Sequence, residues 1–273
     1  MAKKQSVIKI LLKRDLSSAL YSWGYYLVLF ASLLVSSFIL KNFIEGINEE
    51  DILVSAYPLN YPLYITIIIV SIYLVIVSAI SITREKEQGT LEVLFYGPVT
   101  SSSFLLSKYF KDLTLGVISL AFIALYFYLV SAITNLGFTV GLVKALIMGI
   151  FLISCVVSFG LFISTITGKI RSSILTLIAL IGVFLAIQVA HGTLLGFEQE
   201  SLSVPMLYLR QTISYLFYGV NWVSPFAFLS RGFDAVALGS WPLYLSNIGY
   251  CLIYSFIFVA LSIYTMNKRG VKA

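Results

Sequence analysis

Charged side chains are scarce in this sequence, and their scarcity excludes most soluble folds. Asp, Glu, Lys and Arg make up 11% of the 273 residues, whereas 59% are hydrophobic; a soluble domain has about 25% charged residues. Uncharged stretches, each longer than the roughly 20 residues that a helix needs to cross a bilayer, extend over 16–40, 52–83, 113–143, 145–168, 172–197 and 235–267. Because lipid offers no partner for backbone polar groups, such stretches form helices. The sequence therefore predicts an all-α integral membrane protein.

Motifs typical of enzymes and of ion-driven carriers are also missing. The midsections of the predicted spans contain no Asp, Glu, Lys or Arg, which argues against an ion- or proton-driven carrier. The chain has no HExxH, no GxSxG and no phosphate-binding loop. Cys155 and Cys251 fall inside predicted spans without a metal-ligand spacing, and we interpret them as packing residues. We expect no enzyme activity, metal or cofactor in this chain.

The basic residues are distributed unevenly between the two sides of the predicted membrane. Fourteen of the 18 Lys and Arg residues precede the first predicted span or follow the second, fourth and sixth. This bias places both termini in the cytoplasm, and it accounts for the net charge of +6 without nucleic acid. Anionic lipid headgroups could add to it. We expect a multi-pass protein of a prokaryotic plasma membrane.

The whole chain, 1–273, is predicted to be one transmembrane domain. Its six predicted spans are 23–40, 61–82, 104–132, 143–166, 172–189 and 243–266. Residues 1–20, with Lys9 and Lys13 on one face, suit an interfacial helix, or an extension of the first span. Residues 192–242 are apolar but interrupted by Pro225 and Arg231. A seventh span there would move the C-terminal lysines outside, so we predict an extracellular re-entrant helical region.

Small residues recur in the fourth predicted span. Gly160, Ser164 and Gly168 follow one another at intervals of four, so they lie on one helix face. Such a stripe lets a neighbouring helix approach closely. We interpret it as a packing feature.

Residues 84–103 form the informative cytoplasmic segment. Gly89 permits a turn, Thr90 can cap a short helix, and Gly97 and Pro98 end it. Within that helix Leu91, Leu94 and Phe95 share one apolar face. Such a face can dock into a partner's groove or lie on the membrane, and the spacing does not decide between them.

The same segment carries a family resemblance. Residues 85–100, EKEQGTLEVLFYGPVT, are similar to the cytoplasmic signature of the type-2 family of ABC transporter permeases. The matching positions are Glu85, Glu87, Gly89, Thr90, Leu91, Glu92, Leu94, Pro98 and Lys108. Residues 159–173 and 224–236 add weaker matches, so the resemblance extends over nearly the whole chain.

The resemblance implies a permease subunit of an ATP-driven exporter. Such a subunit pairs with a second permease copy or relative and docks ABC ATP-binding subunits, two per complex, which hold ATP and magnesium. It implies that the coupling residues are Glu85, Glu87, Gly89, Thr90, Leu91, Glu92, Leu94, Phe95 and Pro98. Spans two and five would frame the transport route, near Tyr64, Ile68, Tyr73, Leu185 and Gln188. The aromatic-rich spans favour a hydrophobic or amphipathic cargo.

Two other functions stay open on the sequence alone. A membrane scaffold or immunity subunit would hold a partner without moving a substrate. A secondary carrier or channel would transport by itself, but a carrier should show a duplicated hydropathy pattern, and none is found. A stably bound ATP-binding subunit would distinguish the permease from both.

Overall fold

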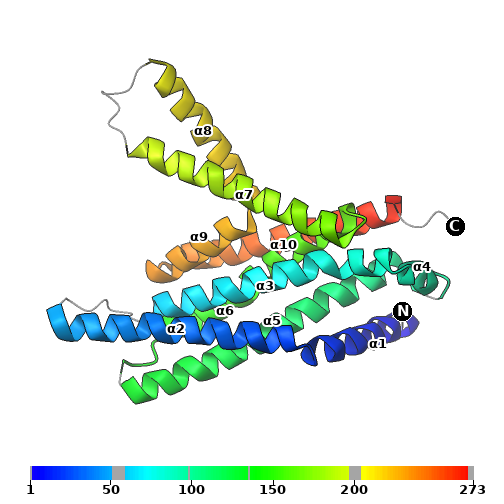
Figure 1. The fold of residues 1–273 in the computed structure, drawn as a ribbon, viewed down its shortest axis with the longest axis horizontal. Coiled ribbons are helices and arrows are strands. Elements are labelled where there is room, and N and C mark those ends of the chain that lie inside the picture. Colours follow the sequence, from blue (N-terminus) through cyan, green and yellow to red (C-terminus); the bar gives the residue numbers. More distant parts are fainter. Residues whose placement is uncertain (1, 51–58, 98, 135, 197–203, 270–273) are drawn as a thin grey trace.

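The structure is a computed structural model that describes residues 2–50, 59–97, 99–134, 136–196 and 204–269. This part of the chain is helical and contains no strand. The helices are α1 Ala2–Leu20, α2 Trp23–Glu50, α3 Asn60–Glu87, α4 Thr90–Phe95, α5 Ser101–Thr134, α6 Val140–Ile166, α7 Ile170–Leu195, α8 Val204–Val223, α9 Pro225–Ala237 and α10 Trp241–Arg269. Figure 1 shows most of them aligned along one long axis.

Six helices are long and apolar enough to cross a membrane: α2, α3, α5, α6, α7 and α10. This confirms the predicted all-α membrane fold with six spans. The helices extend beyond the predicted apolar stretches, and α3 continues through the charged residues to Glu87. A helix that has already formed gains a hydrogen bond for each further residue, so the charged sequence prolongs it.

Helices α1, α8 and α9 are not among the six candidate spans. Helix α8 packs against α7, and α9 packs against α6 and α10 (Figure 1). The α8–α9 turn is closed by Arg231, which donates to the carbonyl of Asn221 and places its guanidinium 4.8 Å from the ring centre of Trp222. The interfacial position of α1 and the re-entrant path of α8 and α9 stay predictions.

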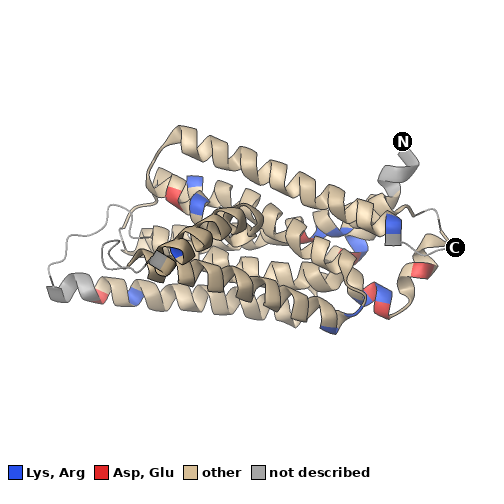
Figure 2. Ribbon diagram, turned by 90° about the horizontal axis from the view of Figure 1, so that it is seen from above, with Lys and Arg blue, Asp and Glu red and all other residues tan. Residues whose placement is uncertain are grey.

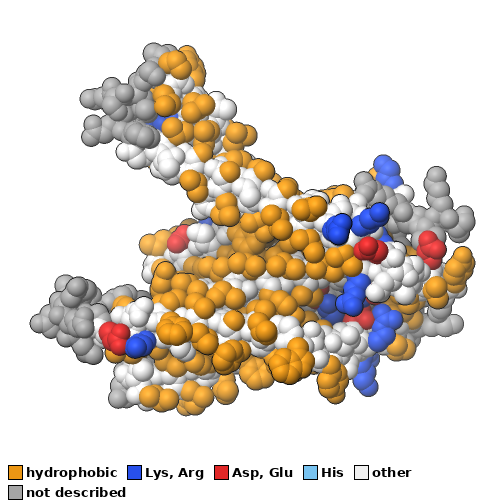
Figure 3. Space-filling model, viewed as in Figure 1, with side chains coloured by type: hydrophobic (Ala, Val, Ile, Leu, Met, Phe, Trp, Pro, Cys, Tyr) orange, Lys and Arg blue, Asp and Glu red, His pale blue; other side chains and the backbone are white. Residues whose placement is uncertain are grey.

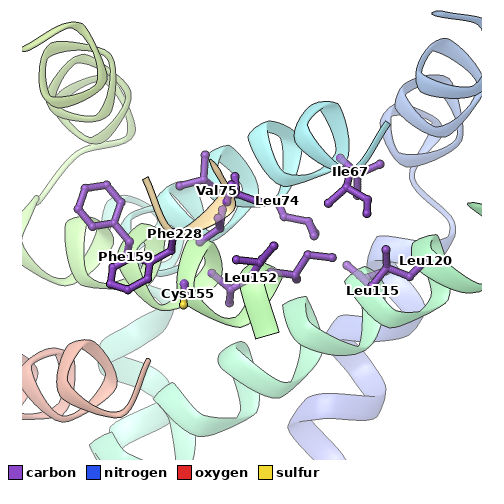
Figure 4. Close-up of a cluster of buried hydrophobic side chains, with 14 of the residues drawn as sticks. Ile67, Leu74, Val75, Leu115, Leu120, Leu152, Cys155, Phe159 and Phe228 are labelled. Atoms are coloured by element: carbon purple, nitrogen blue, oxygen red, sulfur yellow. The ribbon is translucent and has the colours of Figure 1, made fainter. Parts of the chain in front are cut away.

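Helix α6 lies at the centre of the bundle. It packs against α3, α5, α9 and α10, and most of its length is buried, whereas most of α7 is exposed. Figure 4 shows side chains of α3 and α9 near Leu152 and Cys155 of α6, with Leu115 and Leu120 of α5 on the side of Ile67. Cys155 and Cys251 are both buried and free, which supports their interpretation as packing residues.

Charges gather at one end of the bundle. Figure 2 shows most of the lysines and arginines near the end where α4 lies, and Figure 3 shows a broad band of apolar side chains next to them. We call this end the α4 end; it comprises α1, α4, the α6–α7 connection and the last turns of α10.

The small residues of α6 have separate roles. A Cβ atom at Gly160 would lie 2.7 Å from the carbonyl oxygen of Val75 and 2.9 Å from the Cβ of Ser78, whereas at Gly168 it would meet no atom within 4 Å. Gly160 is therefore needed for the close approach of α3 and α6, and Gly168 is not.

We expect Gly160→Ala to lower the thermal unfolding midpoint of the detergent-solubilised chain, because overpacking costs about 1–3 kcal/mol. Gly182→Ala is the matched control: it lies in α7 with no atom within 4 Å of the added Cβ. Alanine there should be neutral or stabilising, since glycine costs a helix roughly 0.5–1 kcal/mol relative to alanine. Equal midpoints for the two variants would contradict the packing argument.

Candidate functional site

Helix α4 is set off from α3 by a single glycine. Gly89 has a φ of 69°, a left-handed conformation that glycine adopts without steric cost. This confirms the predicted turn. Thr90 does not cap α4 as the sequence suggested: it is the first residue of α4, and its hydroxyl donates to the carbonyl of Glu85 at 3.2 Å. Thr90 therefore ties α4 back to the last turn of α3.

The two sides of α4 differ in exposure. Leu91 is 6% exposed, and the half-buried Leu94 and Phe95 pack against the apolar core of the chain. On the other side Val93 is 70% exposed and Tyr96 is 90% exposed. The apolar face identified from the sequence is thus turned inward, to the chain's own helices, and a different surface faces outward.

Glu92 shares the outward surface, since its side chain is also exposed. We call Glu92, Val93 and Tyr96 the outer face of α4. Pro98, another predicted coupling residue, lies outside the described residues.

Glu85 joins three helices through a buried ion-pair cluster. The ammonium of Lys108 on α5 contacts the Glu85 carboxylate and lies 2.7 Å from Oδ2 of Asp15 on α1. Arg14 adds a contact of 3.6 Å to Glu85. The side chains of Asp15, Glu85 and Lys108 are 12%, 13% and 7% exposed, so α1, α3 and α5 are held together by charges largely removed from water.

The charge state of Asp15 fits this arrangement. Burial raises the pKa of its carboxyl, but Lys108 and Arg14 together lower it further, so the pKa of Asp15 lies below its ordinary value. Asp15 is therefore ionised at neutral pH. Because its pKa is lower in the folded chain, its stabilising contribution is complete above the unfolded pKa and is lost only as the pH falls through the folded one.

The next two residues of α3 reach two further helices. Lys86 Nζ donates to the carbonyls of Thr165 and Thr167, at 2.8 and 3.1 Å, where α6 ends. Glu87 Oε2 accepts the backbone N–H of Ile170, the first residue of α7, at 3.1 Å. A cation at a helix C-terminus and an anion at an N-terminus both match the helix dipole. Residues 85–87 thus contact four helices.

Serines of α6 and α7 bind the backbone of α3 just before these charges. Ser164 Oγ accepts the N–H groups of Ile82 and Thr83 at 3.0 and 3.1 Å. Ser173 Oγ donates to the carbonyl of Ala79 at 2.6 Å. Side chains that enter a helix's own hydrogen-bond ladder fix or bend it locally. Ser164 is therefore more than the packing residue that the sequence suggested.

Asp112 is a buried carboxylate that the sequence analysis did not identify. It is fully buried, accepts a hydrogen bond of 2.9 Å from Ser78 of α3, and lies 2.6 Å from the ammonium of Lys111. The sequence shows Lys108, Lys111 and Asp112 near the start of the predicted span 104–132, but it does not show that Asp112 is buried. An ionised group so deeply buried is stable only when paired.

The predicted pathway residues fall into two groups. Tyr64, Ile68 and Tyr73 of α3 are half-buried against helices of the same chain, with the Tyr64 ring stacked 4.1 Å from Phe233 of α9. Leu185 and Gln188 lie exposed on α7. The structure does not bring the two groups together within the chain, and their role in transport stays a prediction.

Comparison with known protein families identifies the family of this chain. A family model described as ABC-2 family transporter protein matches residues 4–271. The chain belongs to the ABC-2 transporter family. A search of curated proteins finds no significant match. The family resemblance seen in the sequence is confirmed, and the chain is a membrane permease of a family that normally works with an ATP-binding subunit.

In this ABC-2 permease, we expect Lys108→Met to destabilise the fold by about 3 kcal/mol, because two largely buried carboxylates then keep only the half-exposed Arg14 as a partner. Lys41→Met is the control, since Lys41 pairs with Glu45 at 3.5 Å but both are more than half exposed; its cost should stay below about 1 kcal/mol. The measurement is the thermal unfolding midpoint in detergent. Adding Glu85→Gln and Asp15→Asn to Lys108→Met should restore part of the loss; equal effects of the two lysine variants would contradict the cluster's role.

Proposed function

We propose that the chain is the membrane-spanning permease subunit of an ATP-driven ABC exporter, and that α4 couples it to the ATP-binding subunit. The observation that carries the proposal is the two-sided structure of α4: its inner side is anchored in the bundle, and its outer side is free to contact a partner. A separate subunit binds ATP and magnesium and hydrolyses the nucleotide.

This function requires the α4 end to face the cytoplasm, where ATP is available. The bias of basic residues supports this orientation, because Lys and Arg remain on the cytoplasmic side of membrane proteins. It places the N- and C-termini and both predicted cytoplasmic loops on the side of the ATP-binding subunit. The membrane is then the plasma membrane of a prokaryote.

The contacts of residues 85–87 support a mechanism in which the span ends move together. A displacement of α4 passes to α3 through Gly89 and Thr90, and from Glu85 to α1 and α5. Lys86 and Glu87 extend the path to the ends of α6 and α7. Because these contacts are buried or hydrogen-bonded, they resist local deformation and favour collective movement.

The predicted coupling residues thereby divide into two roles. Leu91, Leu94 and Phe95 position α4, as do Glu85, Glu87, Gly89 and Thr90 through the contacts described above. Glu92 lies on the outer face and contacts the ATP-binding subunit, together with Val93 and Tyr96, which were not among the predicted coupling residues. Tyrosine, the type of Tyr96, is one of the residues enriched among those that contribute most to protein interfaces.

The exposed surface of α7 supports pairing with a second permease, either another copy or a relative. Leu185 and Gln188 lie on this surface, and a long apolar helix that its own chain leaves uncovered is open to a partner or to lipid. In a pair, each permease docks one ATP-binding subunit, which gives two per complex. Because the spans that would line the transport route are rich in apolar and aromatic residues, a hydrophobic or amphipathic cargo suits them.

The first test is co-purification. The tagged chain, extracted from its native membrane in mild detergent, should retain an ATP-binding subunit and ATPase activity. In reconstituted vesicles the complex should move substrate only with hydrolysable ATP. A complex with bound ATPase but no nucleotide-dependent movement would support the membrane scaffold instead, and transport by the chain alone would support a carrier.

We expect the double variant Val93→Asp, Tyr96→Ala to weaken binding of the ATP-binding subunit at least about tenfold, since interface aromatics often contribute more than the 1.4 kcal/mol that a factor of ten requires. The matched control is Val140→Asp, because Val140 is 71% exposed and lies outside the α4 end. Both variants should fold, as judged by gel filtration and unfolding midpoint. Unchanged binding by the double variant would exclude the outer face as the docking surface.

A further inference from the structure

An apolar pocket of about 310 Å³ lies between α6, α7 and α10. Phenylalanines from all three helices line it: Phe159 and Phe162 of α6, Phe184 of α7 and Phe258 of α10. The Phe258 ring lies 5.3 Å from Phe162 and 5.8 Å from Phe159. Thr176 is the polar residue of this lining, so the pocket suits an apolar group. Its volume is at the lower end of the range for small-molecule sites, about 300–1,000 Å³.

The pocket opens on the outside of the bundle. Two of its rim residues, Ile166 and Leu261, are 38% and 40% exposed. Val223, the last residue of α8, also lines it. The pocket is therefore accessible from outside the bundle, which in a membrane is occupied in part by lipid.

Three basic residues of the α4 end lie beyond this pocket along the chain. All three are exposed, and each lies close in sequence to a residue that lines the pocket. Lys169 is three residues after Ile166, and Arg171 is five residues before Thr176. Lys268 is seven residues after Leu261. At 1.5 Å of helix rise per residue, the last two separations correspond to about 8 and 10 Å along the axis. Among the described residues, none of the three lies within 4 Å of a carboxylate. The carboxylate of Glu87 accepts the N–H of Ile170, the residue between Lys169 and Arg171.

We propose that this pocket binds one acyl chain of an anionic phospholipid, with the phosphate of its headgroup held by Lys169, Arg171 and Lys268. The apolar pocket within the membrane matches the acyl chain of such a lipid. The cations at the ends of the spans match its anionic headgroup. Each basic residue near an anionic headgroup adds about fivefold to binding. The site needs only that α7 and α10 span the bilayer, so it does not rest on the proposed export function.

The charges favour a lipid over a second copy of the chain at this place. A second copy related by an axis across the membrane would bring its own Lys169, Arg171 and Lys268 to the same end. Like charges placed opposite each other disfavour such a contact. A phospholipid instead supplies the anion that the three cations lack.

The test uses the full-length chain in nanodiscs of phosphatidylcholine that contain about one tenth phosphatidylglycerol with a photoreactive diazirine in its acyl chain. After illumination, mass spectrometry should locate most of the label in residues 159–166, 176–184 and 258–261. Unlabelled phosphatidylglycerol should compete for the site, and unlabelled phosphatidylcholine should not.

Two variants separate the headgroup from the pocket. The double variant Lys169→Gln, Arg171→Gln should lower labelling of the pocket at least fivefold, whereas Lys9→Gln, Lys13→Gln, which removes two exposed cations of α1 at the same end, should leave it unchanged. Thr176→Trp should block the pocket and remove the label without lowering the unfolding midpoint by more than a few degrees. The unfolding midpoint is measured for every variant, so a loss of label that results from misfolding can be recognised.

Several results would overturn the proposal. Label spread evenly over all lipid-facing helices, or equal labelling by diazirine-bearing phosphatidylcholine, would mean that the pocket is ordinary lipid-exposed surface. Persistence of the label in Thr176→Trp would place the acyl chain elsewhere. Chain-to-chain cross-links at Phe184 or Phe258, from photoreactive residues placed there, would show that a second copy fills the pocket.

Discussion

Lys108 lies between the carboxylates of Asp15 and Glu85, and the arrangement of the α4 end depends on this buried contact. Each of the three charges would be costly so far from water without the others. Their mutual neutralisation lets α1, α3 and α5 meet where the apolar bundle ends. Because α4 follows directly from this end of α3, its position is determined by the same contact.

The charged signature of the ABC-2 family is, in this chain, largely an internal structure. Glu85, Lys86 and Glu87 are consecutive on α3, yet they contact different neighbours: an ion-pair cluster, the carboxyl end of α6 and the amino end of α7. Successive residues of a helix point about 100° apart, so three in a row reach around most of the helix. This geometry explains how a short motif can set the positions of several spans.

The bundle combines a tightly packed centre with a loosely covered side. Gly160 lets α3 approach α6 closely, and Ser164 and Ser173 add hydrogen bonds to the backbone of α3. Helix α7 is held at its first turns by Glu87 and Ser173, while the rest of it is mostly exposed. Although α8 also packs against it, α7 exposes most of its length, and this surface is open to other molecules, protein or lipid.

The sequence by itself determined the six spans, the turn at Gly89 and the family, because the thickness of the hydrocarbon core sets span length and because the motif at 85–108 is contiguous. It could not show which side of α4 faces inward, since an apolar spacing is the same whether it packs on its own bundle or on a partner. Nor could it identify the partners of Glu85, which lie on α1 and α5. The burial of Asp112 against α3 was equally hidden. These features depend on contacts between residues far apart in the chain, such as Asp15 with Lys108 and Ser78 with Asp112. Only the tertiary structure brings such side chains together, because their pairing follows from how the helices pack and not from their local sequence.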